Sequence, residues 1–289
     1  MRADSDGVVI ATGGDGRWFP ADPDRLRGDI NDYMEGATLA ADLDGRIVAA
    51  IAPHAGYIYS GPVAGYTFRA IRDSARAGFA PDCVIVLGFG HHRASEGVAL
   101  LQAEHLTSPA GSSRMDRDAA ALLTQGRARI QMDSAPHHGE HSAENMVPFV
   151  QMALPETPLV VGIVGDHAPA TLRELGEGLG ELASTRNVLV IASTDLLHDP
   201  DYDRVGRSDR KTLQHITAMD SEVLAASWDY QHQVCCGIAP VLVTIDYARR
   251  QGCRAGTLLH YRNSGDDHPE GRGQWVVGYG AVVFTAATR

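Results

Sequence analysis

Cysteine is scarce in this sequence, which has only four cysteines in 289 residues: Cys83, Cys235, Cys236 and Cys253. No CxxC pair occurs, and a disulfide between the adjacent Cys235 and Cys236 would be strained. A zinc ribbon is therefore excluded, and a disulfide-stabilised scaffold is not expected in a chain of this length.

Long hydrophobic runs are also missing. The longest, residues 47–53 and 159–164, have the length of a β-strand. They fall far short of the roughly 18 apolar residues that a membrane-spanning helix needs. The first residues, MRADSDGVVIATGG, contain no apolar core typical of a signal peptide. We therefore expect a cytoplasmic protein with no membrane partner.

Positively charged residues are fewer than negatively charged ones. The sequence has 25 Lys and Arg against 36 Asp and Glu, a formal net charge of −11 with neutral His, and a pI near 5.6. Such an acidic surface repels phosphate groups, so nucleic acids and anionic membranes are not expected partners. Hydrophobic residues make up 44% of the chain, which excludes wholesale disorder and predicts a substantial core.

Several common catalytic motifs are absent as well. The glycine pairs at 88–90 and 278–280 lack the G-x-G-x-x-G spacing of a dinucleotide-binding loop, and neither G-x-S-x-G nor a P-loop occurs. Histidine, in contrast, is abundant, with 13 residues. Because imidazole acts as a general base and as a metal ligand, this excess is the first indication of chemistry.

Apolar runs of strand length alternate with helical patterns along the chain. Dense Val, Ile and Leu predict strands buried on both faces over residues 46–52, 83–88, 159–164 and 188–193. Apolar spacing and terminal signals predict helices over residues 62–72, 116–125, 142–152, 169–183, 208–226 (one or two helices) and 238–250. Strands over 276–285 and 257–261 are expected to lie near each other at the end of the chain.

This alternation predicts an α/β layered sandwich, with a central sheet that is mostly parallel or mixed and helices on both faces. No internal repeat, low-complexity tract or Pro/Ser-rich linker divides the chain. We therefore expect one domain over residues 1–289, with residues 1–45 as an N-terminal extension packed on it.

Polar side chains follow three of the expected strands directly. His54 follows the first strand, His91 and His92 follow the second, and Asp195 and His198 follow the fourth. Ligands of open α/β sheets bind beyond the carboxyl ends of the strands. If these three strands are parallel neighbours, their side chains converge on one cleft and form a shared site.

The residue types at these positions suit a first-row transition metal. Imidazole binds Fe, Zn, Cu and Ni, and a carboxylate or a thiolate completes such a site. Because His91 and His92 are adjacent and point in different directions, only one of them is expected to be a ligand. Asp195 and His198 both face the site if the turn that holds them is helical. Asp195 then either binds the metal or orients an imidazole.

Two further segments carry candidate groups. His141 precedes an expected helix with Ser142 as its N-cap, and the helix dipole is expected to lower the pKa of His141 and keep it neutral as a base. A hydrogen-bonded loop residue is the alternative interpretation of His141. Cys236 precedes the helix over 238–250, where a lowered thiol pKa would make it a metal ligand or a nucleophile. Cys235 is expected to be buried by packing.

Taken together, these segments resemble the MEMO family, also called the AmmeMemoRadiSam system protein B family. The resemblance runs from about the first strand to the C-terminus, in consistent order. It rests on Ala52-Pro53-His54-Ala55-Gly56-Tyr57 with Tyr59-Ser60-Gly61-Pro62, Leu87-Gly88 before His91-His92, Glu140-His141-Ser142, Ser193-Thr194-Asp195 with His198, Cys236-Gly237 with Pro240, Tyr261-Arg262-Asn263-Ser264-Gly265-Asp266, and Val277-Gly278-Tyr279-Gly280-Ala281.

That family is similar in fold to the class III non-haem iron extradiol dioxygenases of the LigB type. The resemblance implies a metal pocket with His54, His91 and Cys236 as the ligands. A Cys in place of the carboxylate usual for the dioxygenases softens the site and favours Fe(II) or Cu. Fe(II) is therefore the expected cofactor, with Cu or Zn as the alternatives.

The resemblance also implies catalytic residues around that pocket. Asp195 would lie close to the metal, and His141 and His198 would be acid–base or orienting groups. The chain departs from the family at residues 13–20, GGDGRWFP, and at Phe89-Gly90, both near the expected pocket. These departures indicate a specialised substrate.

We therefore expect a non-haem metal-dependent oxidoreductase, an enzyme of dioxygenase type that uses Fe(II) and O₂ on a small aromatic or phenolic substrate. One alternative is a MEMO-like pocket that holds a metal or a peptide without turnover. The other is a metal-free enzyme in which Cys236 is a nucleophile paired with His141 or His198. The expected partners are a small-molecule substrate and O₂, and the sequence is compatible with a homo-oligomer.

Overall fold

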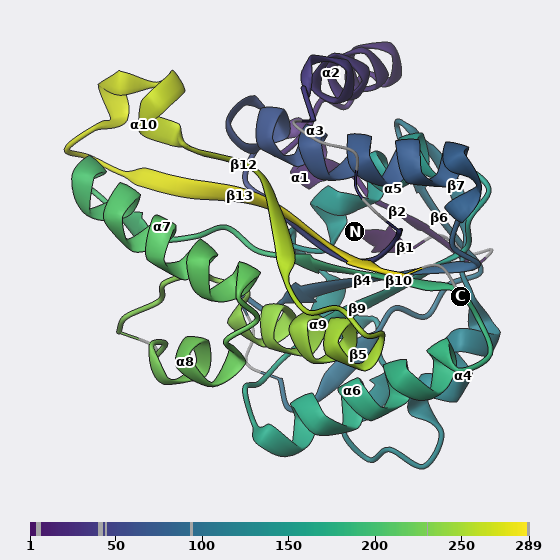
Figure 1. Ribbon diagram of the computed structural model, residues 1–289. Coiled ribbons are helices and arrows are strands. Elements are labelled where there is room, and N and C mark those ends of the chain that lie inside the picture. Colours follow the sequence, from purple (N-terminus) through teal and green to yellow (C-terminus); the bar gives the residue numbers. More distant parts are fainter. Residues whose placement is uncertain (4–6, 40–42, 44, 93–94, 230, 288–289) are drawn as a thin grey trace.

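A computed structural model describes residues 1–3, 7–39, 43, 45–92, 95–229 and 231–287. In these ranges the main sheet contains nine strands, with helices on both faces (Figure 1). Its strands lie in the order β11 (His198–Asp199), β13 (Val276–Ala286), β3 (Arg46–Ala52), β10 (Val188–Ser193), β4 (Cys83–Phe89), β9 (Leu159–Val164), β5 (Val98–Leu100) and β8 (Ile130–Met132), and β12 (Gly256–Asn263) pairs with β13. A smaller sheet joins β1 (Arg2–Ala3), β2 (Val8–Ile10), β6 (His105–Ser108) and β7 (Gly111–Arg114).

The centre of the main sheet is parallel and its margins are mixed. β3, β10, β4 and β9 are consecutive parallel neighbours. β13 pairs antiparallel with β3, and β5 pairs antiparallel with β9. Nearly every residue of the four central strands is buried, as expected for strands covered on both faces. The expected α/β layered sandwich is confirmed.

Helices cover the two faces of this sheet (Figure 1). One face carries α2 (Pro23–Gly36), α3 (Tyr57–Ser74) and α5 (Val147–Ala153). The other face carries α4 (Arg117–Thr124), α6 (Pro169–Ala183), α7 (Tyr202–Thr217), α8 (Ser221–Ala226) and α9 (Ile238–Arg250). The short elements are α1 (Gly13–Gly16), α10 (Ser264–Asp267), a π-helical turn (Ala75–Phe79) and 3₁₀ turns at Ala135–His137, Glu144–Met146 and Pro269–Gly271.

The side chains of β3 show how the sheet separates two halves of the core. Ala49 and Ile51 pack into the cluster that contains α6 and α9. Ala50 and Ala52 pack into the cluster that contains α3 and α5. This alternation follows from the twofold period of a strand. The carboxyl ends of the central strands are thereby held between two packed layers.

Most expected helices are present, and three of them differ in their ends. α3 begins at Tyr57 and therefore contains Pro62, which the sequence analysis placed at the helix start. The N–H of Tyr57 instead donates to the carbonyl of Trp18, so contact with the N-terminal segment fixes this helix start. The range 208–226 forms two helices, α7 and α8, and α7 begins earlier, with Asp201 as its N-cap.

The helix expected over 142–152 is the third case. A 3₁₀ turn over Glu144–Met146 precedes α5, which begins at Val147. The expected N-cap role of Ser142 is wrong, because its hydroxyl accepts from the N–H of Phe89 at 3.1 Å and donates to the carbonyl of Phe89 at 2.9 Å. This segment is therefore tied to the end of β4 rather than to the helix that follows it.

The N-terminal residues expected to form an extension contribute β1, β2, α1 and α2 to the structure, while 4–6, 40–42 and 44 lie outside the described residues. In α2, Leu26, Ile30 and Met34 are fully buried and belong to the cluster that contains α3. No helix in the described part of the chain is long and apolar enough to cross a membrane.

Candidate metal centre

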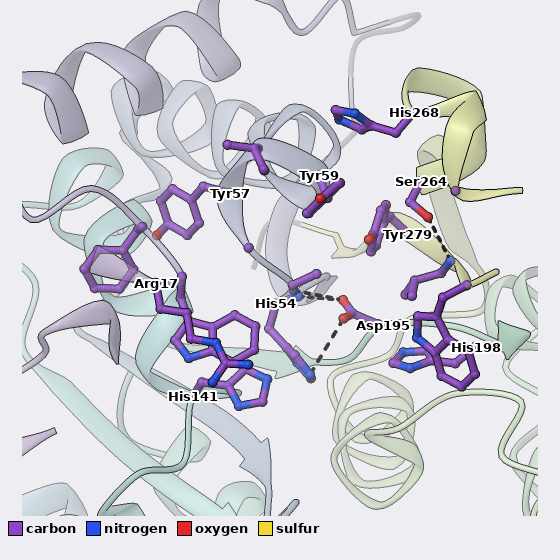
Figure 2. A pocket seen from close by; sticks show the side chains of 18 of the residues that line it. Arg17, His54, Tyr57, Tyr59, His141, Asp195, His198, Ser264, His268 and Tyr279 are labelled. Carbon is purple, nitrogen blue, oxygen red and sulfur yellow. Dashed lines mark hydrogen bonds and ion pairs between the residues drawn. The ribbon is translucent and has the colours of Figure 1, made fainter. Parts of the chain in front are cut away.

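Three adjacent parallel strands bring the predicted site residues to one edge of the sheet. β10 lies between β3 and β4, with Ser193 opposite Ala52 in the register. His54, His91 and Asp195 follow these three strands and line one cavity. Figure 2 shows His54 and Asp195 in its wall. The condition that the sequence analysis set for a shared site is therefore met.

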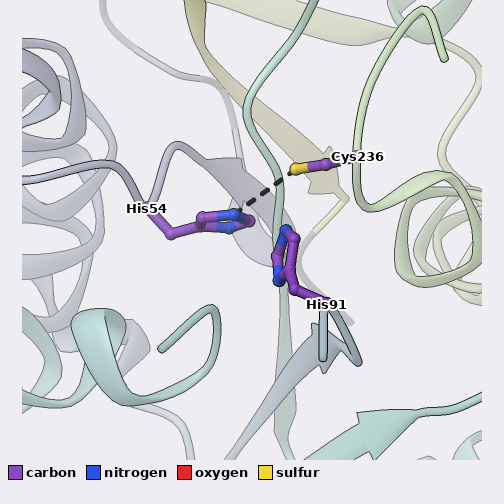
Figure 3. Close-up of side chains that lie close together, drawn as sticks. All are labelled: His54, His91 and Cys236. Atoms are coloured by element: carbon purple, nitrogen blue, oxygen red, sulfur yellow. Dashed lines mark hydrogen bonds between the residues drawn. The ribbon is translucent and has the colours of Figure 1, made fainter. Parts of the chain in front are cut away.

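His54, His91 and Cys236 lie together at this edge (Figure 3). Their ligand atoms all lie within 4.8 Å of one another, and His54 Nε2 lies 3.4 Å from the Sγ atom of Cys236. His54 and Cys236 are buried, whereas the side chain of His91 is 23% exposed and borders the cavity. Two imidazoles and a thiol thus converge from β3, β4 and the start of α9.

Ser193 fixes the tautomer of His54. The Ser193 hydroxyl lies 2.9 Å from His54 Nδ1 and donates to the carbonyl of Ser142 at 2.6 Å. Because its single proton is committed to that carbonyl, the hydroxyl accepts a hydrogen bond from Nδ1. His54 Nε2 therefore presents a lone pair toward Cys236, which is the form that a metal ligand requires.

Cys236 is held by close packing at the end of β10. Its Sγ atom accepts a hydrogen bond from the backbone N–H of Asp195 at 3.2 Å. A Cβ atom on the adjacent Gly237 would meet the Ser193 carbonyl oxygen at 2.5 Å, so only glycine permits this approach. Burial, and then the charge of Asp195, raise the pKa of the Cys236 thiol well above its ordinary value. The expected lowering by the helix terminus is wrong, because burial dominates.

Asp195 contacts the centre from β10. Its Oδ1 atom accepts from the backbone N–H groups of His54 at 2.8 Å and Ala55 at 3.3 Å. Its Oδ2 atom lies 3.9 Å from His54 Nε2. Burial raises the pKa of this carboxyl. Asp195 thus orients the segment that carries His54, with one oxygen beside the ring.

Residues 195–197 form neither a helix nor a strand, so the helical turn that was the condition for Asp195 and His198 to face one site does not form. The N–H of Leu196 donates to the carbonyl of Gly278, and the N–H of Gly278 donates to the carbonyl of Leu197. These hydrogen bonds hold the segment against β13. Asp195 and His198 nevertheless line the same cavity, and burial lowers the pKa of His198.

His141 lies beside the two candidate imidazole ligands. Its ring stacks on Trp18 with centroids 4.0 Å apart and planes 5° apart. Burial, and then the nearby His54, lower the pKa of His141 to about 3. The expected direction is confirmed but its cause is not the helix dipole, because α5 begins six residues later.

The cavity has a volume of about 890 Å³, and its walls combine aromatic rings with imidazoles and charged side chains. Trp18 and Trp275 line it. So do Tyr59, Tyr279, His141 and His198, which are labelled in Figure 2. The guanidinium of Arg17 lies 5.0 Å from the Trp18 ring centroid at the same wall. A cavity of this size and composition can enclose a small organic molecule beside the histidines.

Sequence reasoning missed the roles of Glu140, Ser193 and Trp18. Glu140 and Ser193 were named only as parts of motifs, yet their side chains bond the rings of His91 and His54, respectively. Trp18 was named only as part of a departure from the family pattern. Each acts on a residue more than 40 positions away, and no local pattern carries that information.

The sequence matches the family described as Memo-like protein over residues 13–283. It is 34% identical over 278 residues to the MEMO1 family protein MK0963 of Methanopyrus kandleri, covering 93% of this chain and 96% of that protein. It is 31% identical over 271 residues to the MEMO1 family protein MTH_45 of Methanothermobacter thermautotrophicus, covering 91% and 96%. The similarity to these relatives therefore extends over nearly the whole length of both chains.

A solved structure is also similar. The uncharacterized protein JW3007 from Escherichia coli K12 superposes with a TM-score of 0.52 at 14% sequence identity. The match covers 82% of this chain and 99% of that chain. At this level of identity the likeness shows a common fold and nothing about chemistry.

Proposed function

The chain belongs to the Memo-like protein family, and from this premise we propose that it is a non-haem metal-dependent oxidoreductase with dioxygenase-type chemistry. The proposed cofactor is Fe(II), with Cu or Zn as the alternatives, and the proposed substrates are O₂ and a small aromatic molecule. The observation that carries the proposal is the convergence of His54, His91 and Cys236 beside an aromatic cavity.

The donor set fits a first-row transition metal. Two imidazole nitrogens and a sulfur suit Fe(II), Cu or Zn, whereas Mg²⁺ and Ca²⁺ prefer oxygen ligands. Because burial raises the pKa of the Cys236 thiol, a metal bound there would have to displace its proton, which a divalent cation does by stabilising the thiolate. The exposed side of His91 toward the cavity leaves room for further ligands.

When bound, Fe(II) would bind O₂ and the aromatic substrate side by side and pass electrons from the substrate to O₂, chemistry that no side chain of the protein supplies. His141 and His198 are then the candidate proton acceptors. Burial lowers the pKa of both rings, so each is neutral at pH 7 and can take a proton from a phenolic hydroxyl. Asp195 holds the backbone of His54 in place and lines the same cavity as both proton acceptors.

The walls of the cavity support an aromatic substrate. Tyr59 and Trp275 line the cavity with 40% and 58% of their surface exposed, and a flat molecule can stack on such rings. Trp18 is itself held by its stacking on His141, so a substrate ring against this wall would lie next to a proton acceptor. The geometry thus supports a substrate that is both aromatic and phenolic.

Metal analysis of paired variants tests the proposed centre. The site variants His54→Ala, His91→Ala and Cys236→Ser are compared with the controls His92→Ala and Cys235→Ser. Each protein is loaded anaerobically with Fe(II) and desalted. Because each control removes the adjacent residue of the same type, we expect one iron per chain in the wild type and controls and none in the site variants. Stoichiometric iron in His91→Ala and in His54→Ala would contradict the proposal.

Oxygen uptake separates the enzyme from its alternatives. The iron-loaded protein is expected to consume O₂ with at least one member of a panel of catechols, whereas a binding module would consume none. In the metal-free alternative, turnover would survive a chelator. In that alternative the nucleophile Cys236 would be paired with His54 rather than with His141 or His198. Among the described residues, the imidazole within hydrogen-bond distance of the Cys236 Sγ atom is that of His54.

A further inference from the structure

Glu140 is a buried carboxylate beside the candidate metal centre, and the proposed reaction leaves it without a role. Its side chain is only 3% exposed. Oε1 accepts from His91 Nδ1 at 2.9 Å, and Oε2 accepts from the backbone N–H of His91 at 2.6 Å. Oε1 also accepts from the backbone N–H groups of His141 at 2.9 Å and Ser142 at 2.8 Å. One carboxylate therefore ties together two loops that are 49 residues apart in the chain.

The same carboxylate forms a second group with His91 and His141 whose ligand atoms lie within 4.8 Å of one another. This group is less suited to a metal than the first one. Oε1 already accepts three hydrogen bonds, which saturates its lone pairs. A metal bound to Glu140 would displace those hydrogen bonds and release the two loops. The contacts of Glu140 therefore favour a role in orienting a histidine that binds the metal.

The histidine that Glu140 orients is His91. Both carboxylate oxygens of Glu140 accept hydrogen bonds from backbone N–H groups, so the side chain acts as an acceptor, and His91 Nδ1, 2.9 Å from Oε1, carries the proton. The other ring nitrogen, Nε2, is directed toward His54 and Cys236 (Figure 3).

We propose that Glu140 is a positioning residue, which holds His91 in the Nδ1-protonated tautomer and aims its Nε2 lone pair at the site shared with His54 and Cys236. This inference rests on the proposed metal centre. A carboxylate that accepts from the second nitrogen of a ligating imidazole fixes the ring and raises its basicity. Glu140 thus does for His91 what Ser193 does for His54.

Zn²⁺ affinity measured by competition with a chromophoric chelator tests this role. Glu140→Gln keeps the size of the side chain, but its amide nitrogen cannot accept the bond from the His91 backbone. We expect Zn²⁺ to bind about 10- to 100-fold more weakly than to the wild type. Glu140→Asp keeps the charge at a shorter reach, so we expect an intermediate affinity and a folded protein.

A second readout needs no metal. In ¹⁵N NMR at a pH at which the ring is neutral, His91 of the wild type is expected to show the Nδ1–H tautomer, and Glu140→Ala, which removes the acceptor, is expected to lose this preference. The His91 signal is assigned by its absence from His91→Ala. An unchanged tautomer together with unchanged Zn²⁺ affinity would overturn the role of Glu140 and leave the proposed function standing.

Glu144→Gln is the matched control. Glu144 is equally buried in the same loop, but its carboxylate holds the backbone N–H groups of Thr12 and Gly13. We expect this variant to lose thermal stability and keep its Zn²⁺ affinity; an equal loss of affinity would reduce Glu140 to a structural role. If the wild type itself binds no Zn²⁺ or Fe(II), the proposed function fails, and the tautomer of His91 still tests Glu140.

Discussion

Three neighbouring histidines of the site differ in the direction of their pKa shifts because they differ in their partners. Burial lowers the pKa of His54 and of His141 to about 3 in each case. His91 is also partly buried, but its hydrogen bond to Glu140 outweighs burial and raises its pKa. The cluster therefore keeps two neutral rings next to one ring with a carboxylate partner. This arrangement limits the repulsion among imidazoles that lie about 5 Å apart.

These lowered pKa values predict a loss of stability in acid. The folded protein leaves His54 and His141 neutral down to about pH 3, whereas the unfolded chain protonates both below about pH 6.5. The stabilisation is thus fully present above pH 6.5 and is lost as the pH falls toward 3. His141→Phe retains an aromatic ring against Trp18 but removes the titrating imidazole. We expect the slope of the unfolding free energy against pH to be smaller in this variant than in the wild type, by about 1.4 kcal/mol per pH unit between pH 6 and 4.

Urea unfolding of the metal-free protein measures this difference. At pH 8 the histidines are neutral in both states, so the difference between His141→Phe and wild type at that pH reports packing alone and is subtracted. Parallel curves for the two proteins from pH 6 to pH 4 would contradict the lowered pKa of His141.

At the scale of elements, the sequence predicted well what depends on local pattern. The four buried strands and the helices α6 and α9 were predicted nearly to the residue, because continuous apolar runs and helical spacing are local signals. Their order placed His54, His91 and Asp195 at one sheet edge. The connections were predicted poorly, because bonds to distant residues decide them. Ser142 is committed to Phe89, and the segment after Asp195 pairs with β13.

The packing of α9 against β10 carries a testable consequence. Gly237 lies at the N-terminus of α9, where an added Cβ would meet the Ser193 carbonyl oxygen at 2.5 Å and the Thr194 Cβ at 2.9 Å. Gly237→Ala must therefore push the start of α9 away from β10, and Cys236 moves with it. We expect a loss of about 1–3 kcal/mol in unfolding free energy, together with weaker Zn²⁺ binding.

Gly28→Ala is the control for this substitution. Gly28 lies in the exposed middle of α2 with no atom within 4 Å of the added Cβ, and we expect a gain of about 0.5–1 kcal/mol. Chemical denaturation and Zn²⁺ titration of both variants check the pair. Normal Zn²⁺ affinity in a folded Gly237→Ala protein would contradict the link between this packing and the site.

At the scale of the whole molecule, the sheet couples two core clusters that share no helix. Trp18 packs against the cluster that contains α3 and α5, and Trp228 packs against the cluster that contains α6 and α9. Because β3 alternates its side chains between these clusters, neither can unfold and leave the strand intact. This coupling supports the expectation of one domain, with the N-terminal residues unfolding together with the rest.

Single-tryptophan variants test that expectation from the two faces separately. Trp228→Phe with Trp275→Phe leaves Trp18 as the reporter, and Trp18→Phe with Trp275→Phe leaves Trp228. In each variant we expect the fluorescence midpoint in urea to coincide with the midpoint from far-ultraviolet circular dichroism, because one cooperative unit unfolds in one step. The comparison within a variant removes any effect of the substitutions on stability. If the Trp18 fluorescence midpoint came at a lower urea concentration than the loss of secondary structure, the N-terminal segment would be a separate unfolding unit. The cavity wall that contains Trp18 would then be able to open while the metal centre stays folded.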